Sequence, residues 1–550
     1  MTKIVIVGGV AGGATAAARL RRLDELAEII IFERGGFVSF ANCGLPYYVG
    51  RVITNRDALL LQTPESFRQR FNVDVRVQSE VLSIDRSAKT VEVLSRKTGE
   101  RYRESYDKLI LSPGAAPTRP QIEGINSKRV FALHNMADVD ALTDFIRSNK
   151  PKSAVVAGGG FIGLEAAENL RGLGLKVSIA QSPAQVLTPL DFDMICSVHD
   201  HLRARGISLY LNNRLQSITE RGNKLMIQLK TVELEADMLV LAVGVTPESR
   251  LAREAELAVS ERGGIIVDAA MQTSDPNIYA VGDAIEVTDF VSSQPAIVPL
   301  AGPANKQGRI AADNICGIPS TYKGTQGSLI IKVFDLTVAA TGINEKTAQR
   351  LGLDYDKVVL WLSGHAGYYP GTKPMSLKVL FEKRSGRILG AQAVGFDGVD
   401  KRCDVLAVAI RAGMTAHDLT QLELCYAPPY SSAKDPVNMA GYTIENLLSG
   451  KVKQIHWHDV DGLPRDGSVS LLDVRTSSEV ARGRLAGFIN IPVDSLRARI
   501  GELDKGKPVY VLCHSGLRSY VACRILIQQG FDAYSICGGY RLYSTVKSNL

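Results

Sequence analysis

The chain has 550 residues, too many for one hydrophobic core, so roughly three or four domains are expected. Hydrophobic residues make up 45% and charged residues 22%, as in an ordinary globular protein, and the net charge of +7 is spread along the chain, which argues against a nucleic-acid-binding surface. Eight cysteines without a framework spacing favour reduced thiols and a cytoplasmic location over a secreted disulfide scaffold. The N-terminus lacks a signal-peptide pattern, and no apolar run approaches the ~20 residues of a membrane span.

The N-terminal segment follows the order strand, glycine turn, helix, strand, acidic residue. The apolar run 3–7 predicts a buried parallel strand, and the glycine-rich turn 8–13 leads into a helix expected to begin near Ala14. The next strand ends at Glu33. This order places a pyrophosphate on a helix N-terminus and a ribose hydroxyl on a carboxylate. It predicts a dinucleotide site, although Val10 replaces the middle glycine of the G-x-G-x-x-G pattern.

A second copy of this pattern lies further along the chain. The predicted strand 153–157 is followed by Gly158, Gly160 and Gly163, which supply all three glycines of the fingerprint, and the next strand ends at Gln181. A second dinucleotide site is therefore indicated. A carboxylate at the Gln181 position would favour NADH, but an amide can still bond ribose hydroxyls, and no Arg or Lys follows nearby to meet a 2′-phosphate. NADH is therefore preferred over NADPH.

One cysteine, Cys43, stands in the loop that follows the second strand of the first unit. A flavin-linked dithiol enzyme normally shows a pair of cysteines, but the nearest other cysteine in the sequence is Cys196. If Cys43 is redox-active, it must cycle through a mixed disulfide with a small thiol, a persulfide or a sulfenic acid. A small buried hydrophobe is the commoner fate of an isolated cysteine, but the surrounding nucleotide motifs favour the redox role.

Two further patterns surround this loop. Arg19 and Arg22 share one face of the first predicted helix with Thr15, which fits either a solvated basic face or a phosphate-rich ligand lying toward Cys43. Asp283 follows a strand and a glycine, so its carboxylate can bond the ribityl hydroxyls of a flavin; the alternative is a surface aspartate in a turn.

A new domain begins after a boundary near residues 449–451. The run 509–519 predicts a strand, a short loop carrying Cys513, and the start of a helix. Backbone N–H groups in such a loop form a nest for anions, and the helix N-terminus adds positive potential. Both effects would stabilise a persulfide anion on Cys513, whereas the alternative is a buried cysteine at a strand end.

Two nucleotide motifs, one inserted inside the other, with the returning aspartate, resemble the pyridine nucleotide-disulfide oxidoreductases over residues 1 to about 445. The single-cysteine loop resembles the coenzyme A-disulfide reductase branch, which is related to NADH oxidases and peroxidases. The segment from 458 resembles a single rhodanese domain. The resemblance implies an α/β fold class with two nested Rossmann-like nucleotide-binding domains, an α+β dimerisation domain and a C-terminal α/β rhodanese domain. The implied boundaries are 1–117 and 248–322 for the FAD-binding domain, 118–247 for the NADH-binding domain, 323–448 for the dimerisation domain, 449–457 for a linker and 458–550 for the rhodanese domain.

The resemblance also implies binding residues for each of three ligands. For FAD they are Gly8, Gly13, Glu33, Arg34, Ser112, Gly114, Asp283 and Ala301. For NADH they are Gly158, Gly160, Phe161, Ile162, Gly163, Gln181 and Gly244. For coenzyme A they are Thr15, Arg19, Arg22, Ser39, Asn42, Asn305, Arg309 and Lys434. The guanidinium groups of the three arginines suit the phosphates of coenzyme A.

Catalytic roles follow from the same resemblance. Tyr368 and Tyr426 are expected to reach the flavin and thiol of a second copy in a homodimer with shared active sites, where they can donate protons. Taken alone, these tyrosines would be ordinary core or interface residues. Cys513 is the expected sulfur-carrying nucleophile, and Arg518 matches a rhodanese loop position.

The leading hypothesis is an NADH-dependent reductase of persulfide or polysulfide sulfur. Cys43 would form a mixed disulfide with coenzyme A and release hydrosulfide, while Cys513 delivers or accepts sulfane sulfur. The alternatives are a coenzyme A-disulfide reductase with an accessory rhodanese domain, an NADH peroxidase or oxidase that uses a Cys43 sulfenic acid, and a thiol redox sensor. The expected partners are small sulfur compounds and a second copy of the chain, with no metal, nucleic acid or membrane.

Overall fold

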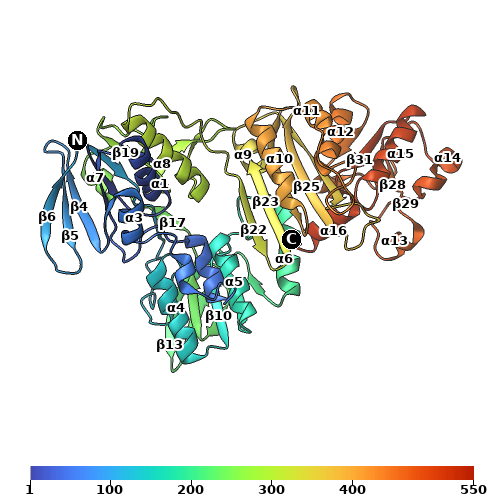
Figure 1. Cartoon of the computed structure of the whole chain (residues 1–550). Helices are drawn as coiled ribbons and strands as arrows, with labels where there is room; N and C mark the ends of the chain where they lie inside the picture. The colour runs from blue at the N-terminus through green and yellow to red at the C-terminus, as the bar shows by residue number, and fades with distance from the viewer. Residues whose placement is uncertain (1) are drawn as a thin grey trace. The chain divides into compact units, whose positions relative to one another are not determined.

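The computed structural model describes residues 2–550, which divide into two compact units (Figure 1). The first unit comprises residues 2–186 and Gly206–Gly327, and the second comprises Leu187–Arg205 and Ser328–Leu550. Helix α6 (Phe192–Ala204) therefore belongs to the second unit, although its sequence lies between strands of the first.

A five-stranded parallel sheet forms one half of the first unit. Its order is β19 (Ile278–Ala280), β7 (Lys108–Leu111), β1 (Lys3–Val7), β2 (Glu28–Phe32) and β3 (Asp74–Arg76). The central strands β1, β2 and β7 are nearly continuous apolar runs, as expected for parallel strands covered on both faces. Helices α1 (Ala11–Leu23) and α8 (Ala301–Ile315) lie side by side (Figure 1), and α3 (Pro64–Phe71) adds Phe67 to the core.

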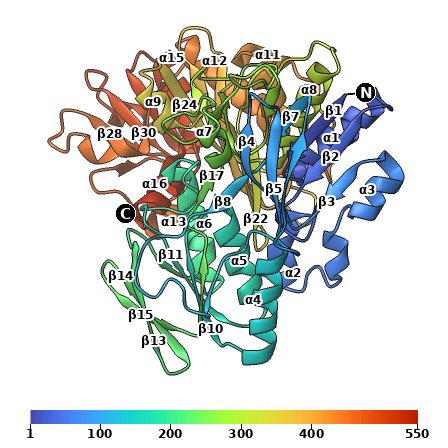
Figure 2. The same cartoon turned by 90° about the vertical axis from the view of Figure 1, so that its left-hand side faces the viewer.

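A second parallel sheet forms the other half of this unit. Its order is β12 (Ser208–Tyr210), β11 (Lys176–Ala180), β10 (Ser153–Ala157), β16 (Met238–Leu241) and β9 (Val130–Phe131). Helices α4 (Met136–Asn149) and α5 (Phe161–Gly172) belong to this half, which Figure 2 shows from the side. Because β19 lies in the first sheet but follows the whole second sheet in the chain, the second nucleotide-type fold is inserted into the first.

Short antiparallel strands complete the first unit. They are β4 (Ser79–Asp85), β5 (Thr90–Ser95) and β6 (Arg101–Ser105) in one sheet, β13 (Leu215–Arg221), β14 (Lys224–Leu229) and β15 (Glu233–Ala236) in another, and β18 (Ile265–Ile266), β20 (Ile285–Thr288) and β21 (Pro295–Ala296) in a third, in which β18 and β20 run parallel. The chain crosses between the two halves through the paired strands β8 (Ala115–Pro117) and β17 (Val245–Pro247), and α7 (Arg250–Glu254) follows the return.

The second unit contains an antiparallel sheet and a small parallel sheet. The antiparallel order is β22 (Leu329–Val333), β23 (Leu336–Gly342), β26 (Ile388–Gly395), β25 (Pro374–Glu382) and β24 (Tyr355–Ser363). Its helices are α9 (Glu345–Arg350), α10 (Val399–Arg411), α11 (Ala416–Gln421) and α12 (Pro436–Leu448), of which α10 packs on β23 and β26. The parallel order is β27 (Lys453–Ile455), β31 (Ala533–Ile536), β30 (Val509–Leu512), β28 (Ser470–Asp473) and β29 (Ile489–Asn490), with helices α13 (Ser477–Ala481), α14 (Leu496–Arg499), α15 (Leu517–Gln528) and α16 (Gly539–Lys547).

This architecture confirms the predicted fold class, and the predicted strands 3–7 and 153–157 coincide with β1 and β10. The first helix starts earlier than the sequence pattern suggested, at Ala11 instead of near Ala14. The reason is that the turn is completed between Gly8, with φ of +96°, and Val10, so Gly12 and Gly13 already lie in the first helical turn. Among residues 2–550, no helix combines the length and apolar character needed to cross a bilayer.

Candidate functional site

The first glycine loop closes so tightly that two of its positions exclude any side chain. A Cβ on Gly8 would lie 2.0 Å from the Ser112 carbonyl oxygen, and a Cβ on Gly13 would lie 2.0 Å from the Gly8 carbonyl oxygen. Glu33, at the end of β2, accepts a hydrogen bond from the Gly9 N–H at 3.0 Å. The loop therefore presents the N-terminus of α1 next to a carboxylate, as a dinucleotide site requires.

The other predicted FAD residues lie around the same carboxyl edge of the sheet. Ser112 follows β7 and its N–H donates to the Val7 carbonyl at 2.8 Å, and Ala301 is the first residue of α8. Arg34 pairs with Glu248 at 3.0 Å, and Gly114, with φ of +74°, forms the turn before β8.

Asp283 is a half-buried carboxylate at this edge. Burial raises the pKa of Asp283, and no hydrogen bond or ion pair of its side chain is found among residues 2–550. A carboxylate in such surroundings needs a partner, because an unpaired buried charge is costly.

The second glycine loop repeats the geometry of the first. A Cβ on Gly158 would lie 2.0 Å from the Ala242 carbonyl oxygen, and a Cβ on Gly163 would lie 2.0 Å from the Gly158 carbonyl oxygen. At Gly160 a Cβ would meet nothing within 4 Å, so space is open in front of α5 for a ligand to approach the backbone.

The predicted NADH residues surround this opening. Phe161 and Ile162 are the first residues of α5, and Gly244 (φ +122°) precedes β17. Gln181 Oε1 accepts a hydrogen bond from the Gly159 N–H at 2.8 Å, as Glu33 does from Gly9. Gln181 Nε2 donates to the Gln185 carbonyl at 3.1 Å, so the amide orientation is fixed.

Cys43 lies in a short 3₁₀ turn, Asn42–Gly44, directly before α2 (Leu45–Val49). The backbone of this loop is tied to the first glycine loop, because the Ser39 N–H donates to the Gly9 carbonyl at 2.8 Å and Ser39 adopts φ of +47°. The Cys43 side chain is exposed. Desolvation by neighbouring atoms raises the pKa of its thiol, and the carboxylates of Glu165 and Asp283 raise it further. The structure thus places this thiol near the acidic residues of both nucleotide loops.

Two residues near Cys43 were not singled out from the sequence. Tyr47, on α2, donates a hydrogen bond from its hydroxyl to Glu165 Oε1 on α5 at 3.2 Å. Burial raises the pKa of Glu165 to about 7. Glu165 stands two residues after Gly163, but nothing in the local pattern reveals that it faces the cysteine helix.

The residues predicted for coenzyme A on α1 and α8 lie together. Thr15 Oγ1 donates to Asn305 Oδ1 at 2.8 Å. Arg19 bonds Asp313 at 2.7 Å, and Arg309 lies 3.9 Å from the same carboxylate. Arg22 is exposed. Asn42 donates from Nδ2 to the His134 carbonyl at 3.3 Å. The α1 and α8 side chains and the cysteine loop all belong to the first unit.

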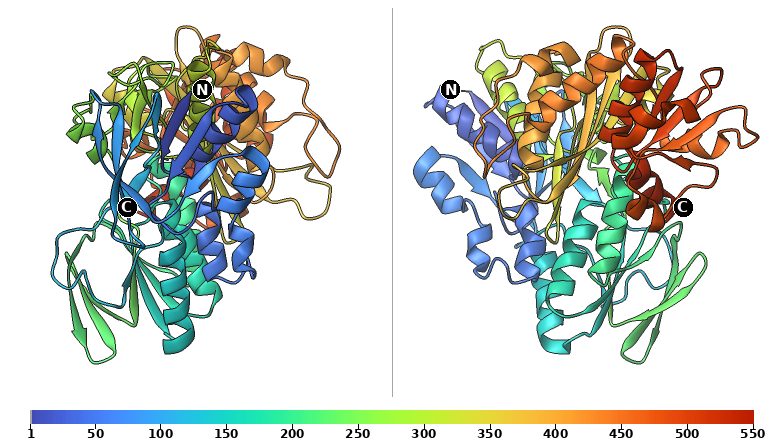
Figure 3. Two further views of the ribbon diagram at one scale, coloured as in Figure 1. Left: turned by 60° about the vertical axis from the view of Figure 1, so that its left-hand side comes forward. Right: turned by 90° about the vertical axis from the view of Figure 1, so that its right-hand side faces the viewer.

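The predicted catalytic tyrosines lie in the second unit. The hydroxyls of Tyr368 and Tyr426 are 2.9 Å apart, and their side chains are 76% and 47% exposed. They come from two loops, after β24 and after α11, that project beside each other (Figure 3). Lys434 is exposed in the segment that follows. The pair is therefore free to meet another molecule.

Cys513 directly follows β30 and is fully buried. Its Sγ accepts a hydrogen bond from the Gly516 N–H at 3.0 Å, in a loop where Gly516 has φ of +106° and α15 begins. Arg518 forms a two-pronged ion pair with Glu479, with both distances 2.7 Å, which lowers the pKa of Glu479 to about 2. Arg475 and Asp473 form a buried pair at 2.7 Å below the loop. One backbone N–H therefore bonds the sulfur, and the thiol in turn donates to Ser519 Oγ at 3.4 Å.

Comparison with known proteins identifies these domains. The model of the pyridine nucleotide-disulphide oxidoreductase family matches residues 2–308, its dimerisation-domain model matches residues 329–436, and a rhodanese-like domain model matches residues 457–545. The chain belongs to the pyridine nucleotide-disulphide oxidoreductase family.

Relatives of this oxidoreductase include proteins with and without the C-terminal domain. The coenzyme A disulfide reductase of Staphylococcus haemolyticus (strain JCSC1435) is 40% identical over 449 residues, 81% of this chain and 100% of the relative. The crystal structure of reduced Bacillus anthracis CoADR-RHD has 50% identity and a TM-score of 0.97, covering 100% of this chain and 98% of that chain. The NAD-dependent persulfide reductase from A. fulgidus has 38% identity and a TM-score of 0.91, covering 98% of this chain and 100% of that chain.

The family implies FAD and a pyridine nucleotide as cofactors of this oxidoreductase. The residues present fit both groups. The first loop has steric room only for glycine at Gly8 and Gly13, and it sits beside the Asp283 carboxylate, to which residues 2–550 offer no hydrogen bond or ion pair. The second loop leaves open space at Gly160 in front of a helix N-terminus.

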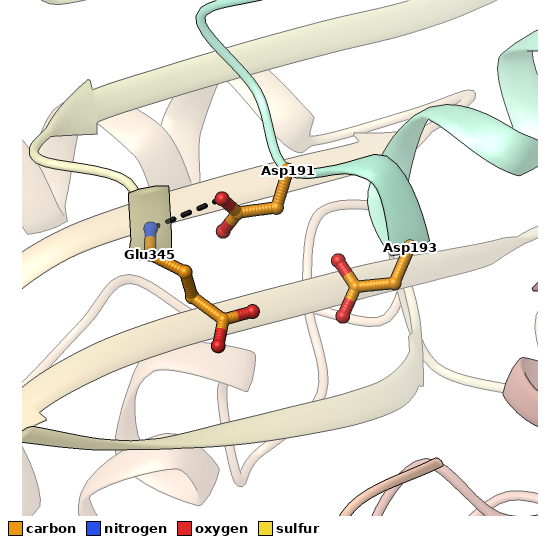
Figure 4. Close-up of side chains that lie close together, drawn as sticks. All are labelled: Asp191, Asp193 and Glu345. Carbon is orange, nitrogen blue, oxygen red and sulfur yellow. Dashed lines mark hydrogen bonds between the residues drawn. The ribbon is translucent and has the colours of Figure 1, made fainter. Parts of the chain in front are cut away.

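A buried cluster of three carboxylates in the second unit, Asp191, Asp193 and Glu345, has a spacing that could hold a cation (Figure 4). Their ligand atoms lie within 4.8 Å of one another. The fully buried ammonium of Lys378 occupies this position, at 2.8 Å from Asp193 and 3.0 Å from Asp191, and it also contacts Glu345. The cluster therefore joins α6, α9 and β25 through a lysine.

Proposed function

We propose that this oxidoreductase uses NADH to reduce the sulfane sulfur of a small persulfide, such as coenzyme A persulfide or a polysulfide, and releases hydrosulfide. The observation that carries this proposal is the pairing of two thiol sites in one chain: exposed Cys43 beside the nucleotide loops, and Cys513 in a loop of the rhodanese-like domain. A rhodanese-type loop handles sulfane sulfur, which a plain NADH oxidase or disulfide reductase does not need. The similarity to a persulfide reductase over 98% of this chain also supports the proposed reduction of sulfane sulfur.

The proposed reaction uses Cys43 as the only redox thiol. The other cysteine of the first unit, Cys316, is the C-cap residue of α8 and packs against the core. The Cys43 thiolate attacks the inner sulfur of coenzyme A persulfide, the one bonded to carbon. The S–S bond of the persulfide breaks, hydrosulfide leaves, and a Cys43–coenzyme A disulfide forms. Two electrons from NADH then return Cys43 and coenzyme A to thiolates, and a proton is released with NAD⁺. Bound FAD supplies the route by which the electron pair passes from NADH to the disulfide.

The ligand assignments are part of the proposal. FAD lies at the first glycine loop, with Glu33 and Asp283, and NADH lies at the second, with Gln181. Thr15, Arg19 and Asn305 hold coenzyme A near Cys43, since guanidinium groups pair well with phosphates. For Arg19 this requires sharing with Asp313, to which it is bonded at 2.7 Å.

We further propose that the active enzyme is a homodimer with shared sites. The presence of a dimerisation domain over residues 329–436 supports dimer formation. The exposed Tyr368–Tyr426 pair of one copy would meet Cys43 of the other and donate protons to the leaving hydrosulfide, and Lys434 would add a phosphate contact. Cys513 would deliver or accept sulfane sulfur.

A coenzyme A-disulfide reductase is the second candidate, because a protein of that name is 40% identical over 81% of this chain. The test is anaerobic NADH oxidation with coenzyme A persulfide and coenzyme A disulfide at matched concentrations, with hydrosulfide assayed alongside. Faster turnover on the persulfide with one hydrosulfide per NADH supports the proposal. Preference for the disulfide would make the rhodanese domain accessory.

A peroxidase using a Cys43 sulfenic acid predicts turnover with hydrogen peroxide exceeding both sulfur substrates. A redox sensor predicts at most a single turnover, so sustained NADH oxidation would exclude it.

A further inference from the structure

A cavity of about 300 Å³ lies within the second unit, between α6, the strands β24 to β26 and the first turn of α16. Its lining includes Trp361 on β24, Arg541 on α16, and Asp200 and His201 on α6. None of these residues takes part in the chemistry assigned to Cys43.

Arg541 is a partly buried cation that has no carboxylate partner within residues 2–550. Its guanidinium carbon lies 3.9 Å from the centroid of the Trp361 ring, and no hydrogen bond or ion pair of the guanidinium is found among residues 2–550. Burial lowers the pKa of Arg541. The same domain pairs Arg475 with Asp473 and Arg518 with Glu479. Because desolvated charges are normally paired, Arg541 stands out as an unneutralised cation.

The indole N–H of Trp361 adds a second donor without an acceptor. Trp361 Nε1 is buried and has no hydrogen-bond partner within residues 2–550. The acidic residue of the cavity is engaged elsewhere, since Asp200 contacts Arg203 at 3.3 Å and Asn549 at 3.0 Å. His201 lies 3.0 Å from Asp335. Guanidinium and indole groups can only donate, so the unmet requirement in this cavity is for an acceptor with negative charge.

Backbone hydrogen bonds link the helix that carries Arg541 to the loop that carries Cys513. The N–H of Tyr540 donates to the Cys513 carbonyl at 2.8 Å, and the N–H of Arg541 donates to the His514 carbonyl at 3.0 Å. A Cβ on Gly539 would lie 2.7 Å from both carbonyl oxygens, so α16 begins in direct contact with that loop. A ligand held by the Arg541 side chain would therefore contact a residue whose own backbone N–H supports the sulfur-carrier loop.

We propose that this cavity binds a small oxyanion through Arg541 and Trp361, next to the Cys513 loop. The ligand chemistry is that of a tetrahedral oxyanion, with oxygens to accept from the guanidinium and the indole N–H. Two sources offer it: an inorganic sulfur oxyanion such as thiosulfate, or a phosphate group of coenzyme A. The cavity volume suits a small ion with its water, and a whole coenzyme A molecule would extend outside it.

The test uses the fluorescence of Trp361 in the full-length holoenzyme. The chain has only 2 tryptophans, so the Trp457→Phe variant leaves Trp361 as the sole reporter. Thiosulfate, sulfate, inorganic phosphate and coenzyme A are titrated at constant ionic strength held with chloride. We expect a saturable change for at least one of them, and about tenfold weaker binding when Arg541→Gln is added, because a charge-assisted contact is lost. Arg497→Gln, which removes an exposed arginine of the same domain, is the matched control.

The arms of the titration distinguish the sources. A response to thiosulfate or sulfate assigns the site to sulfur oxyanions, and a response to coenzyme A and phosphate alone assigns it to the phosphate source. The proposal is overturned if no anion gives a saturable change, or if Arg541→Gln binds as well as Arg497→Gln. Calorimetric titration of the wild-type and Arg541→Gln proteins gives the same decision should Trp457→Phe fold poorly.

Discussion

The Tyr47 hydroxyl donates a hydrogen bond to the Glu165 carboxylate across 118 residues of sequence, and this contact joins the helix after Cys43 to the helix of the second glycine loop. Burial raises the pKa of Glu165 to about 7, and Glu168 adds to the effect, whereas the Tyr47 hydrogen bond opposes it. Burial and the nearby Glu165 carboxylate raise the pKa of Tyr47. A protonatable carboxyl group thus lies close to the thiol.

The Glu165→Gln variant should change how stability depends on pH. The folded pKa of about 7 exceeds the ordinary value of 4.5, so the native state favours the protonated form. This contribution to stability is complete below pH 4.5 and is lost as pH rises through about 7. The variant stays neutral at this position. Its free energy of unfolding, relative to that of the wild type, should therefore rise by about 2 kcal/mol between pH 5 and pH 8. Thermal unfolding of the holoenzyme at both pH values measures the difference.

The control is Glu220→Gln, which alters an exposed carboxylate of the same unit. It should track the wild type at both pH values. An unchanged pH slope in Glu165→Gln would mean that Glu165 ionises normally in the native protein.

Substitutions of Cys43 and Cys513 should affect different sets of substrates. Cys43→Ser should abolish NADH turnover with every sulfur substrate, because it removes the sulfur that receives the electron pair. Cys513→Ser should leave the turnover rate with small soluble substrates unchanged. It should lower the rate only with substrates that need sulfur transfer through the rhodanese loop. Steady-state rates with coenzyme A persulfide and with thiosulfate plus coenzyme A make the comparison, and Cys316→Ser is the control. Equal losses in the two variants would refute this division of roles.

Lys378→Met should be strongly destabilising. The substitution keeps the side-chain volume but removes the ammonium that contacts Asp193 at 2.8 Å and Asp191 at 3.0 Å, so three buried carboxylates would face one another. Breaking a buried ion pair in this way typically costs about 3–5 kcal/mol. The midpoint of urea unfolding should fall accordingly. Lys383→Met, at a lysine that is 52% exposed, should change it little, and similar midpoints for the two variants would contradict the prediction.

His456 should make the attachment of the rhodanese-like domain sensitive to alkaline pH. Burial lowers the pKa of His456, but its 2.9 Å hydrogen bond to Asp356 and its contact with Cys537 outweigh this and raise it to about 9. The stabilisation is complete below pH 6.5 and is lost as pH rises through about 9. His456→Gln should therefore be less stable than wild type by about 2 kcal/mol at pH 7, with the gap closing by pH 10.

Limited proteolysis of the segment around 450, compared at pH 7 and pH 10, reports this attachment. His417→Gln, at a histidine that is 70% exposed, should leave the cleavage rate unchanged. Wild-type cleavage that does not accelerate with pH would show that the pair does not hold the domain.

The glycine loops could be predicted from the sequence because their geometry is a local steric matter. Gly8, Gly13, Gly158 and Gly163 sit where any Cβ would strike a backbone oxygen, so these positions tolerate little else. The apolar runs of β1 and β10 likewise carry their own signal, since strands covered on both faces need apolar side chains throughout. The nested order and the rhodanese-type loop around Cys513 followed from the same local motifs.

What the sequence could not supply is which charged group meets which partner. The sequence around Arg19 does not predict its bond to Asp313. The sequence around Trp361 does not predict its contact with Arg541, which lies in another domain. The Tyr47–Glu165 contact and the Lys378 cluster likewise join segments far apart in the chain. The sequence alone determined the backbone motifs and the two candidate thiols, because sterics and hydrophobic periodicity act between neighbours. The tertiary structure decided the electrostatics around them, because burial and charge pairing depend on elements that only folding brings together.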